Sequence, residues 1–230
     1  MRIREIVLAA LACASPDPAL MAQGLEAFAS RFSASGVAGV LRIDDQGLGF
    51  SSGELRYEGS SDLAPLVGAT VGFTVVSFLT IEAHYARAAA DIGMQGWRGE
   101  ARLPEPELEE GRVMVDLYGF RGRASFPPEA SLRGSAIVGR GTAEVDVDVA
   151  ILQDGEPVGP SGSTAREPMW EFGGGVEWRP GAHWEMRAEV IDHVQLCDGE
   201  THSEINICGR EGSIDRLHHT AITIAATLRL

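Results

Sequence analysis

The stretch PMWEFGGGVEWRPGAHWEMRAEVIDH, residues 168–193, decides the fold of this chain of 230 residues. Up to residue 179, apolar side chains such as Trp170 and Val176 stand at even positions, and glutamates stand at odd ones. After a short break the same alternation resumes at 183 and continues to 193. A period of two is typical of a β-strand with one apolar and one polar face, and two such segments around a short turn predict a hairpin.

Six further segments alternate in the same way, so the sequence predicts eight strands. They occupy 36–44, where the pattern is weaker, 67–74, 78–87, 112–121, 131 to about 145, and 217–230, besides 168–179 and 183–193. The connections are about 22, 3, 24, 9, 22, 3 and 23 residues long, so long and short ones alternate throughout. Transmembrane barrels of bacterial outer membranes have an even strand number, short turns at one end and long loops at the other. The sequence therefore predicts an all-β, eight-stranded, antiparallel, up-and-down transmembrane β-barrel.

Each predicted strand has one face suited to lipid and one suited to a polar barrel interior. In the segment 78–87, Ile81 lies on the apolar face and Glu82 on the polar one. In the last segment, Ile224 and Thr223 are divided in the same way. Because lipid-facing and lumen-facing side chains alternate along a barrel strand, we expect the apolar faces to point outward.

Three tryptophans predict the height of the lipid-facing band. Trp170 and Trp178 share a face and lie about 26 Å apart along a strand, or roughly 20 Å along the membrane normal at a tilt of about 40°. Trp184 follows the turn and is level with Trp178. We expect Trp170, Trp178 and Trp184 to belong to the aromatic girdle of the barrel.

The polar faces predict a charged lumen. An eight-stranded barrel leaves an interior just wide enough for side chains, and buried charges are costly unless they pair. We therefore expect a salt-bridged plug that stiffens the barrel; an ion path along the same side chains is the alternative, and nothing in the sequence selects it. The expected lumen charge network consists of Glu82, His84, Asp116, Arg133, Glu171, Glu177, Arg187, Glu189 and Arg229, with Arg42 as a further candidate.

The chain resembles the small OmpA-like and OmpX-like outer-membrane β-barrel proteins over nearly all of its predicted mature length. The segments that carry the resemblance are VGATVGF at 67–73, EAHY at 82–85, FGGGVE at 172–177 and the final strand. The family usually ends in Phe with Gly five residues earlier, whereas this chain has Leu230 and Ala225. The resemblance implies a location in the bacterial outer membrane and contact with its lipid and lipopolysaccharide.

The N-terminal residues 1–22 have the pattern of a secretory signal peptide, so we expect the barrel domain to comprise residues 23–230. A short basic start precedes an apolar run too short to span a bilayer, and small residues follow it. Cleavage after Ala14, lipidation of Cys13 and an N-terminal helix packed on the domain are the alternatives.

Two cysteines remain in the predicted mature chain, Cys197 and Cys208. Export to an oxidising compartment favours a disulfide between them, which would contribute about 2–3 kcal/mol by closing a short loop. Two free thiols are the alternative.

The net charge and the types of residue present disfavour several classes of function. With 19 basic and 33 acidic residues the net charge is −14, which disfavours nucleic acid as a partner. The adjacent His202, Ser203 and Glu204 cannot form a triad with one another, and no His or Cys cluster has metal-ligand spacing. We therefore expect no enzymatic activity, no catalytic residue, no metal and no cofactor.

Two functions remain as hypotheses. The first is a structural and surface-interaction barrel whose long extracellular loops contact lipopolysaccharide and surface proteins. Alternation from Ser131 to Ile151 lasts well beyond the roughly 9–11 residues that cross lipid, so this strand should project above the membrane with a partner. The second is a soluble periplasmic β-barrel that binds a small apolar ligand. The two differ in whether Trp170, Phe172 and Trp178 point outward or inward.

Overall fold

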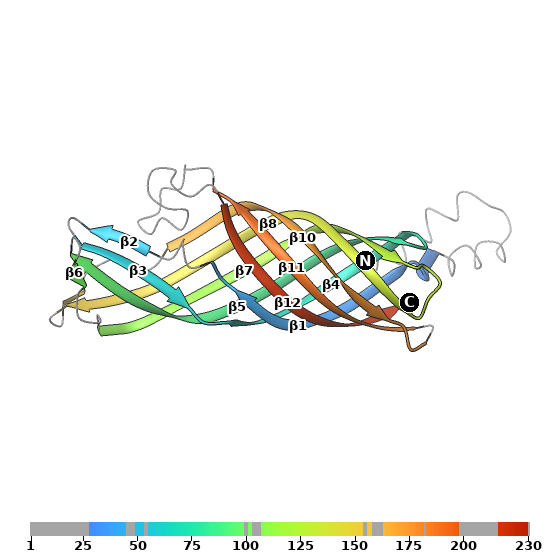
Figure 1. Ribbon diagram of the computed structural model, residues 1–230, viewed down its shortest axis with the longest axis horizontal. Coiled ribbons are helices and arrows are strands. Elements are labelled where there is room, and N and C mark those ends of the chain that lie inside the picture. The colour runs from blue at the N-terminus through green and yellow to red at the C-terminus, as the bar shows by residue number, and fades with distance from the viewer. Residues whose placement is uncertain are drawn as a thin grey trace, which may run out of the picture.

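The chain forms a closed β-barrel that is drawn out at one end into longer strands (Figure 1). No helix among the described residues is long and apolar enough to cross a membrane. The predicted signal peptide, residues 1–22, lies outside the described residues. The computed structural model describes residues 28–44, 49–52, 55–98, 101–102, 107–153, 156–157, 163–181, 183–197 and 216–229.

Eight antiparallel strands close the barrel, each paired with its neighbour along the chain and the last paired with the first. The closing pair joins β1 to β12, with Ser33 opposite Arg229. The predicted fold class and all eight predicted strands are confirmed. The strands are β1 (Phe32–Arg42), β4 (Ala64–Val76), β5 (Leu79–Arg98), β7 (Glu107–Phe126), β8 (Leu132–Gln153), β10 (Ser163–Trp178), β11 (Trp184–Leu196) and β12 (Arg216–Arg229).

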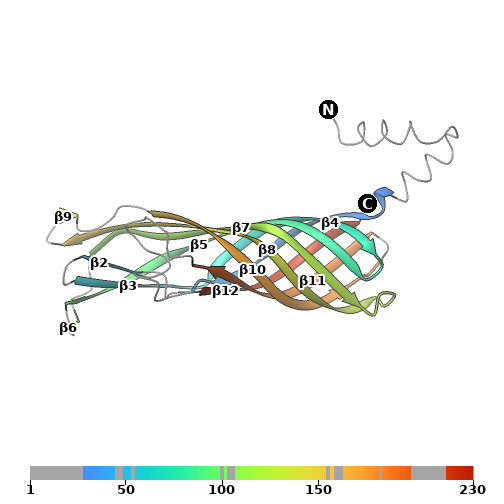
Figure 2. The same cartoon turned by 90° about the horizontal axis from the view of Figure 1, so that it is seen from above.

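The two ends of the barrel differ, as the connection lengths predicted. Short turns join β4 to β5, β7 to β8 and β10 to β11, and they share one end with the start of β1 and the finish of β12 (Figures 1 and 2). We call this the turn end and the opposite one the loop end. The loop end carries four short strands: β2 (Gly49–Ser52), β3 (Leu55–Ser61), β6 (Ala101–Arg102) and β9 (Glu156–Pro157).

Three barrel strands extend far past the others at the loop end. β5 and β7 have 20 residues each and β8 has 22. They continue because each keeps a partner: β3 pairs with the end of β5, and β7 pairs with β8 as far as Leu152. The predicted continuation of β8 beyond residue 145, with a partner, is therefore confirmed, and its projection above the membrane stays a prediction.

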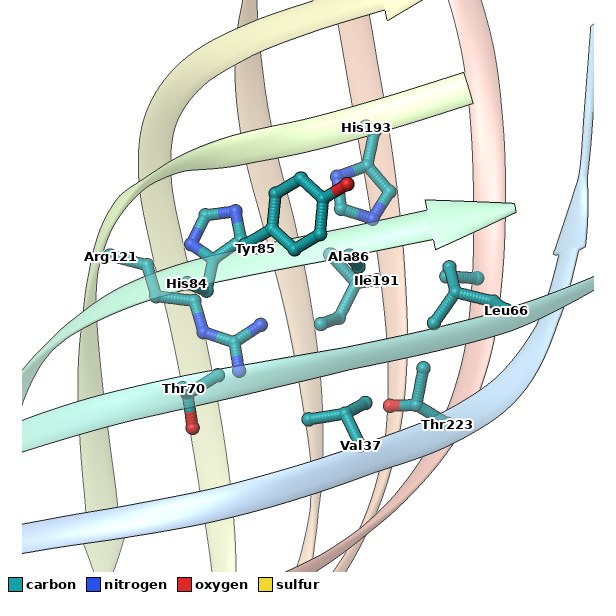
Figure 3. Close-up of a pocket in the computed structure, with 11 residues that line it drawn as sticks. Val37, Leu66, Thr70, His84, Tyr85, Ala86, Arg121, Ile191, His193 and Thr223 are labelled. Atoms are coloured by element: carbon teal, nitrogen blue, oxygen red, sulfur yellow. The ribbon is translucent and has the colours of Figure 1, made fainter. Parts of the chain in front are cut away.

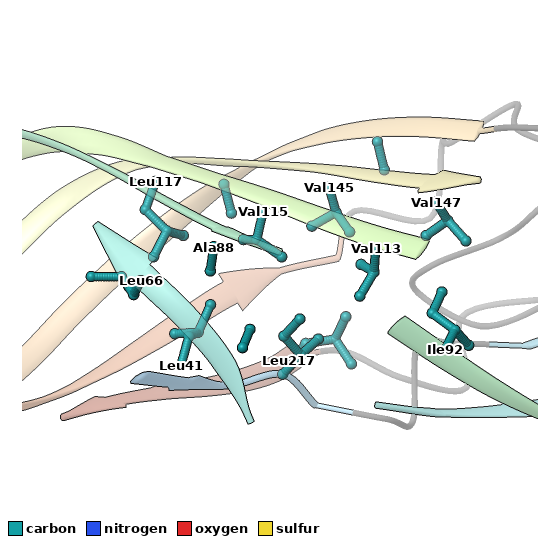
Figure 4. Packing of buried hydrophobic residues seen from close by; sticks show 14 of the residues in the cluster. Leu41, Leu66, Ala88, Ile92, Val113, Val115, Leu117, Val145, Val147 and Leu217 are labelled. Atoms are coloured by element: carbon teal, nitrogen blue, oxygen red, sulfur yellow. The ribbon is translucent and has the colours of Figure 1, made fainter. Parts of the chain in front are cut away.

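The interior changes character along the barrel axis. Near the turn end it is filled with charged side chains, whereas toward the loop end it is apolar (Figure 4). The sequence predicted a polar interior only, so the apolar half is a correction. It forms because the inward positions of the extended strands carry aliphatic residues that pack across the barrel, which removes them from water. The cluster contains Leu41, Ile43, Ala64, Leu66, Ala88, Ile92, Met94, Val113, Val115, Leu117, Ala143, Val145, Val147, Val149, Ala165, Met169, Leu217 and Ala221.

Candidate functional site

The buried carboxylate of Glu82 on β5 is the centre of the lumen network. Its Oε2 atom accepts hydrogen bonds from Arg121 Nε at 2.8 Å and from Arg123 Nη2 at 2.9 Å, both on β7. Its Oε1 atom accepts one from Arg187 Nη1 at 2.7 Å, which reaches it across the lumen from β11. One carboxylate thus ties three strands together through charge-assisted hydrogen bonds.

A second carboxylate, Glu189, shares the same three arginines. Its Oε1 atom lies 2.7 Å from Arg123 Nη2 and 3.4 Å from Arg187 Nε, and its Oε2 atom lies 3.5 Å from Arg121 Nη2. Arg187 also donates to the hydroxyl of Ser35 at 3.1 Å. The two glutamates and three arginines therefore form one cluster that crosses the lumen.

A further group of ion pairs closes the lumen at the turn end. Glu177 pairs with Arg133 and accepts a hydrogen bond from Ser125 Oγ at 2.8 Å. Glu185 accepts from Arg179 Nε at 2.7 Å and from Arg133 Nη2 at 3.1 Å. Arg133 is thereby shared by two carboxylates, and this group continues the charged filling toward the turns.

Two histidines flank another buried carboxylate, that of Glu171, nearer the loop end of the lumen. His84 Nε2 lies 2.8 Å and His193 Nδ1 lies 3.1 Å from Oε1 of Glu171. Gly139 makes room for this group, because a Cβ atom there would lie 2.7 Å from Glu171 Oε2. A cavity of about 30 Å³ borders both histidines and Arg121 (Figure 3). It has room for a couple of water molecules.

Eight of the nine residues assigned to the lumen charge network face the interior. The half-buried Arg229 lies at the turn-end mouth, and the other seven are Glu82, His84, Arg133, Glu171, Glu177, Arg187 and Glu189. Sequence reasoning missed five members of the described network: Arg121, Arg123, Arg179, Glu185 and His193. The signal for them was strand parity, since Arg121 and Arg123 stand at odd positions with the buried Val113 and Val115.

The assignment of Asp116 to the lumen is wrong. Asp116 lies on the outer face of β7 opposite Arg87, whose Nε and Nη2 atoms donate to its carboxylate at 2.8 and 2.6 Å. Tyr85 Oη donates to the same group at 2.6 Å. The segment 112–121 has apolar residues on both faces, so alternation alone did not decide which face turns inward. Arg42 is likewise exposed on the outer face of β1.

The outer surface near the turn end is a continuous apolar band. Trp170 and Trp178 point outward, with 39% and 50% of their surfaces exposed, and Phe172 lies between them. Trp184 is also exposed, at the first position of β11. The alternative of a soluble barrel with inward-facing apolar strands is therefore wrong, because these side chains face away from the lumen.

Phenylalanines that sequence reasoning did not single out surround the turn end. Phe78 and Phe126 stack with ring centroids 5.4 Å apart, and both are exposed. Phe28, Phe32 and Phe73 form a second group, with centroids 5.1 to 5.9 Å apart. Together with Trp178 and Trp184, these rings encircle the turn-end border in the way that aromatic girdles do.

Charged side chains replace the apolar band on the outer face toward the loop end. On β8 the outward positions change from Leu132 and Val138 to Glu144, Asp146 and Asp148. The inward positions change in the opposite sense, from charged to aliphatic. The loop-end half therefore has the polarity of a water-soluble protein, and the turn-end half has that of a membrane barrel.

The predicted disulfide and the histidines considered for catalysis or metal binding lie partly outside the described residues. Cys197 packs against the apolar cluster, but Cys208 lies outside the described residues, so the disulfide stays a prediction. His202, Ser203 and Glu204 lie outside them as well. His218 pairs with Asp192 at 2.9 Å, and no group of three acidic, His or Cys side chains in the described ranges is arranged to hold a metal ion.

Comparison with known proteins identifies the fold. No protein-family model matches the chain, and no curated protein matches it by sequence. Among solved structures, Neisserial surface protein A is similar with a TM-score of 0.53 and 9% identity, covering 86% of this chain and 97% of that one. The outer membrane protein OprG of Pseudomonas aeruginosa has a TM-score of 0.48 and 8% identity, covering 86% and 96%.

The outer membrane protease OmpT of Escherichia coli has a TM-score of 0.46 and 8% identity, covering 86% of this chain and 96% of that one. The likeness to Neisserial surface protein A supports the fold. At 9% identity it says nothing about function. The chain thus has the architecture of the small outer-membrane β-barrels: eight strands, an outward apolar band and a filled lumen.

Proposed function

We propose that this chain is a bacterial outer-membrane protein whose barrel anchors a projecting β-structure at the cell surface, where it contacts lipopolysaccharide and other surface proteins. The observation that carries the proposal is the reversal of polarity along β8. Val138 faces outward and Arg133 inward near the turn end, whereas Asp148 faces outward and Val147 inward near the loop end. Such a strand suits lipid over one half of its length and water over the other.

A structural role without catalysis or solute passage fits the filled lumen. The ion pairs of Glu82 and Glu177 occupy the interior inside the lipid-facing band, and the aliphatic cluster fills the barrel above it. His84 and His193 contact a buried carboxylate, and His219 contacts the amide of Gln195, so these histidines have structural partners. We therefore infer no enzymatic activity.

Cell fractionation followed by gel electrophoresis with and without boiling tests the proposal. We expect the protein in the outer-membrane fraction, with different mobilities before and after boiling, because a closed barrel resists unfolding by detergent. Recovery in the soluble periplasmic fraction without a mobility shift would overturn it. Water-soluble protease added to intact cells should cut only connections at the loop end, and cutting at the turn end would show that the orientation is reversed.

A further inference from the structure

Arg140 occupies an unusual position on the outer surface of β8. It faces outward between Phe120 of β7 and Trp170 of β10, which are its cross-strand neighbours. Its guanidinium carbon lies 5.6 Å from the centroid of the Trp170 ring. Phe120 is 68% exposed, and the outward positions next toward the turn end, Val138 and Phe172, are exposed and apolar. Arg140 is therefore a cation within the upper border of the lipid-facing band.

This cation lacks a carboxylate partner in the described part of the chain. By contrast, Arg87 pairs with Asp116 on the outer face, and Arg133 pairs with Glu177 in the lumen. A guanidinium on the lipid face is costly unless it reaches the headgroups or an opposite charge. The stacking on Trp170 supplies only part of the compensation for its lost hydration. An anion from outside the protein would supply the rest.

A second arginine lies two rows nearer the loop end on the same outer face. Arg166 of β10 reaches over β8, and its guanidinium carbon lies 5.5 Å from the Tyr118 ring centroid. The position between the two arginines is Thr142, whose cross-strand neighbours are Tyr118 and Pro168. The outer surface around Thr142 is thus bordered by one guanidinium below and one above.

Nearby carboxylates decide which arginine contributes more. Asp116 is neutralised by Arg87, whereas Glu144 is the cross-strand neighbour of Arg166 and accepts a hydrogen bond from Tyr118 at 3.5 Å. Glu144 therefore offsets part of the positive charge of Arg166. Arg140 has aromatic neighbours in the corresponding places, so its charge is the less compensated of the two.

We infer that Arg140, assisted by Arg166, binds a phosphate group of a lipid in the outer leaflet, with the acyl chains lying on the apolar surface below. A guanidinium matches the geometry of a phosphate group, and the rings of Trp170 and Phe120 suit the boundary between headgroups and acyl chains. This inference rests on the proposed outer-membrane location, since it needs the loop end to face the leaflet that carries lipopolysaccharide.

The test uses the full-length mature chain folded in uncharged detergent micelles, with diphosphorylated lipid A as the probe. We expect Arg140→Gln to weaken binding about tenfold, as loss of one charge-assisted contact does, and Arg166→Gln to weaken it less. Arg112→Gln is the matched control, because Arg112 is an exposed outer-face arginine whose cross-strand neighbours are Asp91 and Asp148. It should bind as the unaltered chain does.

Lipid A without phosphates and inorganic phosphate complete the design. The dephosphorylated lipid should bind at least tenfold more weakly, and inorganic phosphate at equal concentration should not displace the lipid. Unchanged binding by Arg140→Gln, or equal binding of the dephosphorylated lipid, would overturn the inference. Displacement of the lipid by free phosphate would also overturn it, because the ligand of the site would then be a small anion. Each variant must keep the boiling-dependent mobility. Absence of the chain from the outer membrane would refute the proposed function instead, whatever the micelle result.

Discussion

At the residue scale, Glu82 is the central hydrogen-bond acceptor of the lumen charge network. It accepts hydrogen bonds from Arg121, Arg123 and Arg187 and is almost fully buried. Replacing Glu82 by Gln leaves three buried guanidiniums with one fewer counter-charge. Breaking a buried pair from one side typically costs about 3–5 kcal/mol, so we expect a loss of that order in the free energy of unfolding.

Urea titration of the barrel folded in lipid vesicles, followed by its tryptophan fluorescence, measures this loss. Glu144→Gln is the control, because Glu144 is a half-buried residue on the outer face whose hydrogen bond with Tyr118 is long, at 3.5 Å. We expect it to change the free energy by less than about 1 kcal/mol. A similar small effect at Glu82 would mean that Glu189 suffices to hold the three arginines.

A second residue-scale prediction concerns neighbouring positions on β12. Ile224 is 64% exposed on the lipid-facing side, whereas Thr223 is 4% exposed and lines the lumen cavity. Ile224→Arg should cost about 2–4 kcal/mol if it lies near the bilayer midplane. Thr223→Val should be nearly neutral, because the buried hydroxyl of Thr223 has no hydrogen-bond partner in the described part of the chain. Equal losses at both positions in the vesicle titration would contradict the assigned faces.

At the element scale, strand parity could be predicted wherever one face carries charges. On β10 and β11 the glutamates mark the inward face, so the outward direction of Trp170, Trp178 and Trp184 followed from the sequence. On β7 both faces of the segment 112–121 contain apolar residues, and the assignment of Asp116 failed there. A shift of one residue turns every side chain to the other face, so one ambiguous strand misplaces a whole set of residues.

The apolar half of the interior could not be predicted from strand patterns taken one at a time. Val145 and Val147 alternate with acidic residues in the sequence, which indicates a strand with one polar face. The alternation does not tell whether that polar face points into the barrel or away from it. The answer depends on the neighbours: β7 turns Val113 and Val115 toward the same interior, and packing among them removes apolar surface from water. The lumen ion pairs were predictable as a class, but their partners were not.

The reversal of polarity within β8 predicts different chemical accessibility along one strand. With Cys197 and Cys208 replaced by Ser, single cysteines at Val138, Asp148 and Val147 should behave differently in membranes. A water-soluble maleimide should label the Asp148→Cys chain, because Asp148 is exposed beyond the apolar band. It should not label Val138→Cys in lipid or Val147→Cys in the apolar interior.

Transfer of the same three chains from membranes to micelles and then to denaturant supplies the control. Denaturant should make all three cysteines reactive, which shows that protection came from the fold and its surroundings. A bilayer-soluble quencher should reach a label at position 138 and not one at 148. Rapid maleimide labelling at 138 in intact membranes would show that the lipid-facing band ends closer to the turn end than the outward apolar residues indicate.

At the scale of the whole molecule, two successive layers of side chains fill the lumen along the barrel axis. The ion pairs around Glu82 and Glu189 fill the lumen within the lipid-facing band. Above them, aliphatic side chains such as Leu41, Leu117 and Leu217 fill the interior at the loop end, and all three are fully buried. These two layers lie in series, so an ion must pass both. A barrier of either kind opposes conduction, the first by occupying the space and the second by excluding water.

The two layers predict how altered chains behave in planar lipid bilayers. The unaltered chain should give no discrete conductance steps. Glu82→Ala should also stay silent, because the aliphatic layer remains, and so should Leu117→Ser, because the ion pairs remain. Only the chain with both substitutions should conduct, because both of its layers are disrupted. Steps from Glu82→Ala by itself would show that the aliphatic layer is not a seal, and steps from the unaltered chain would refute the filled lumen as a barrier.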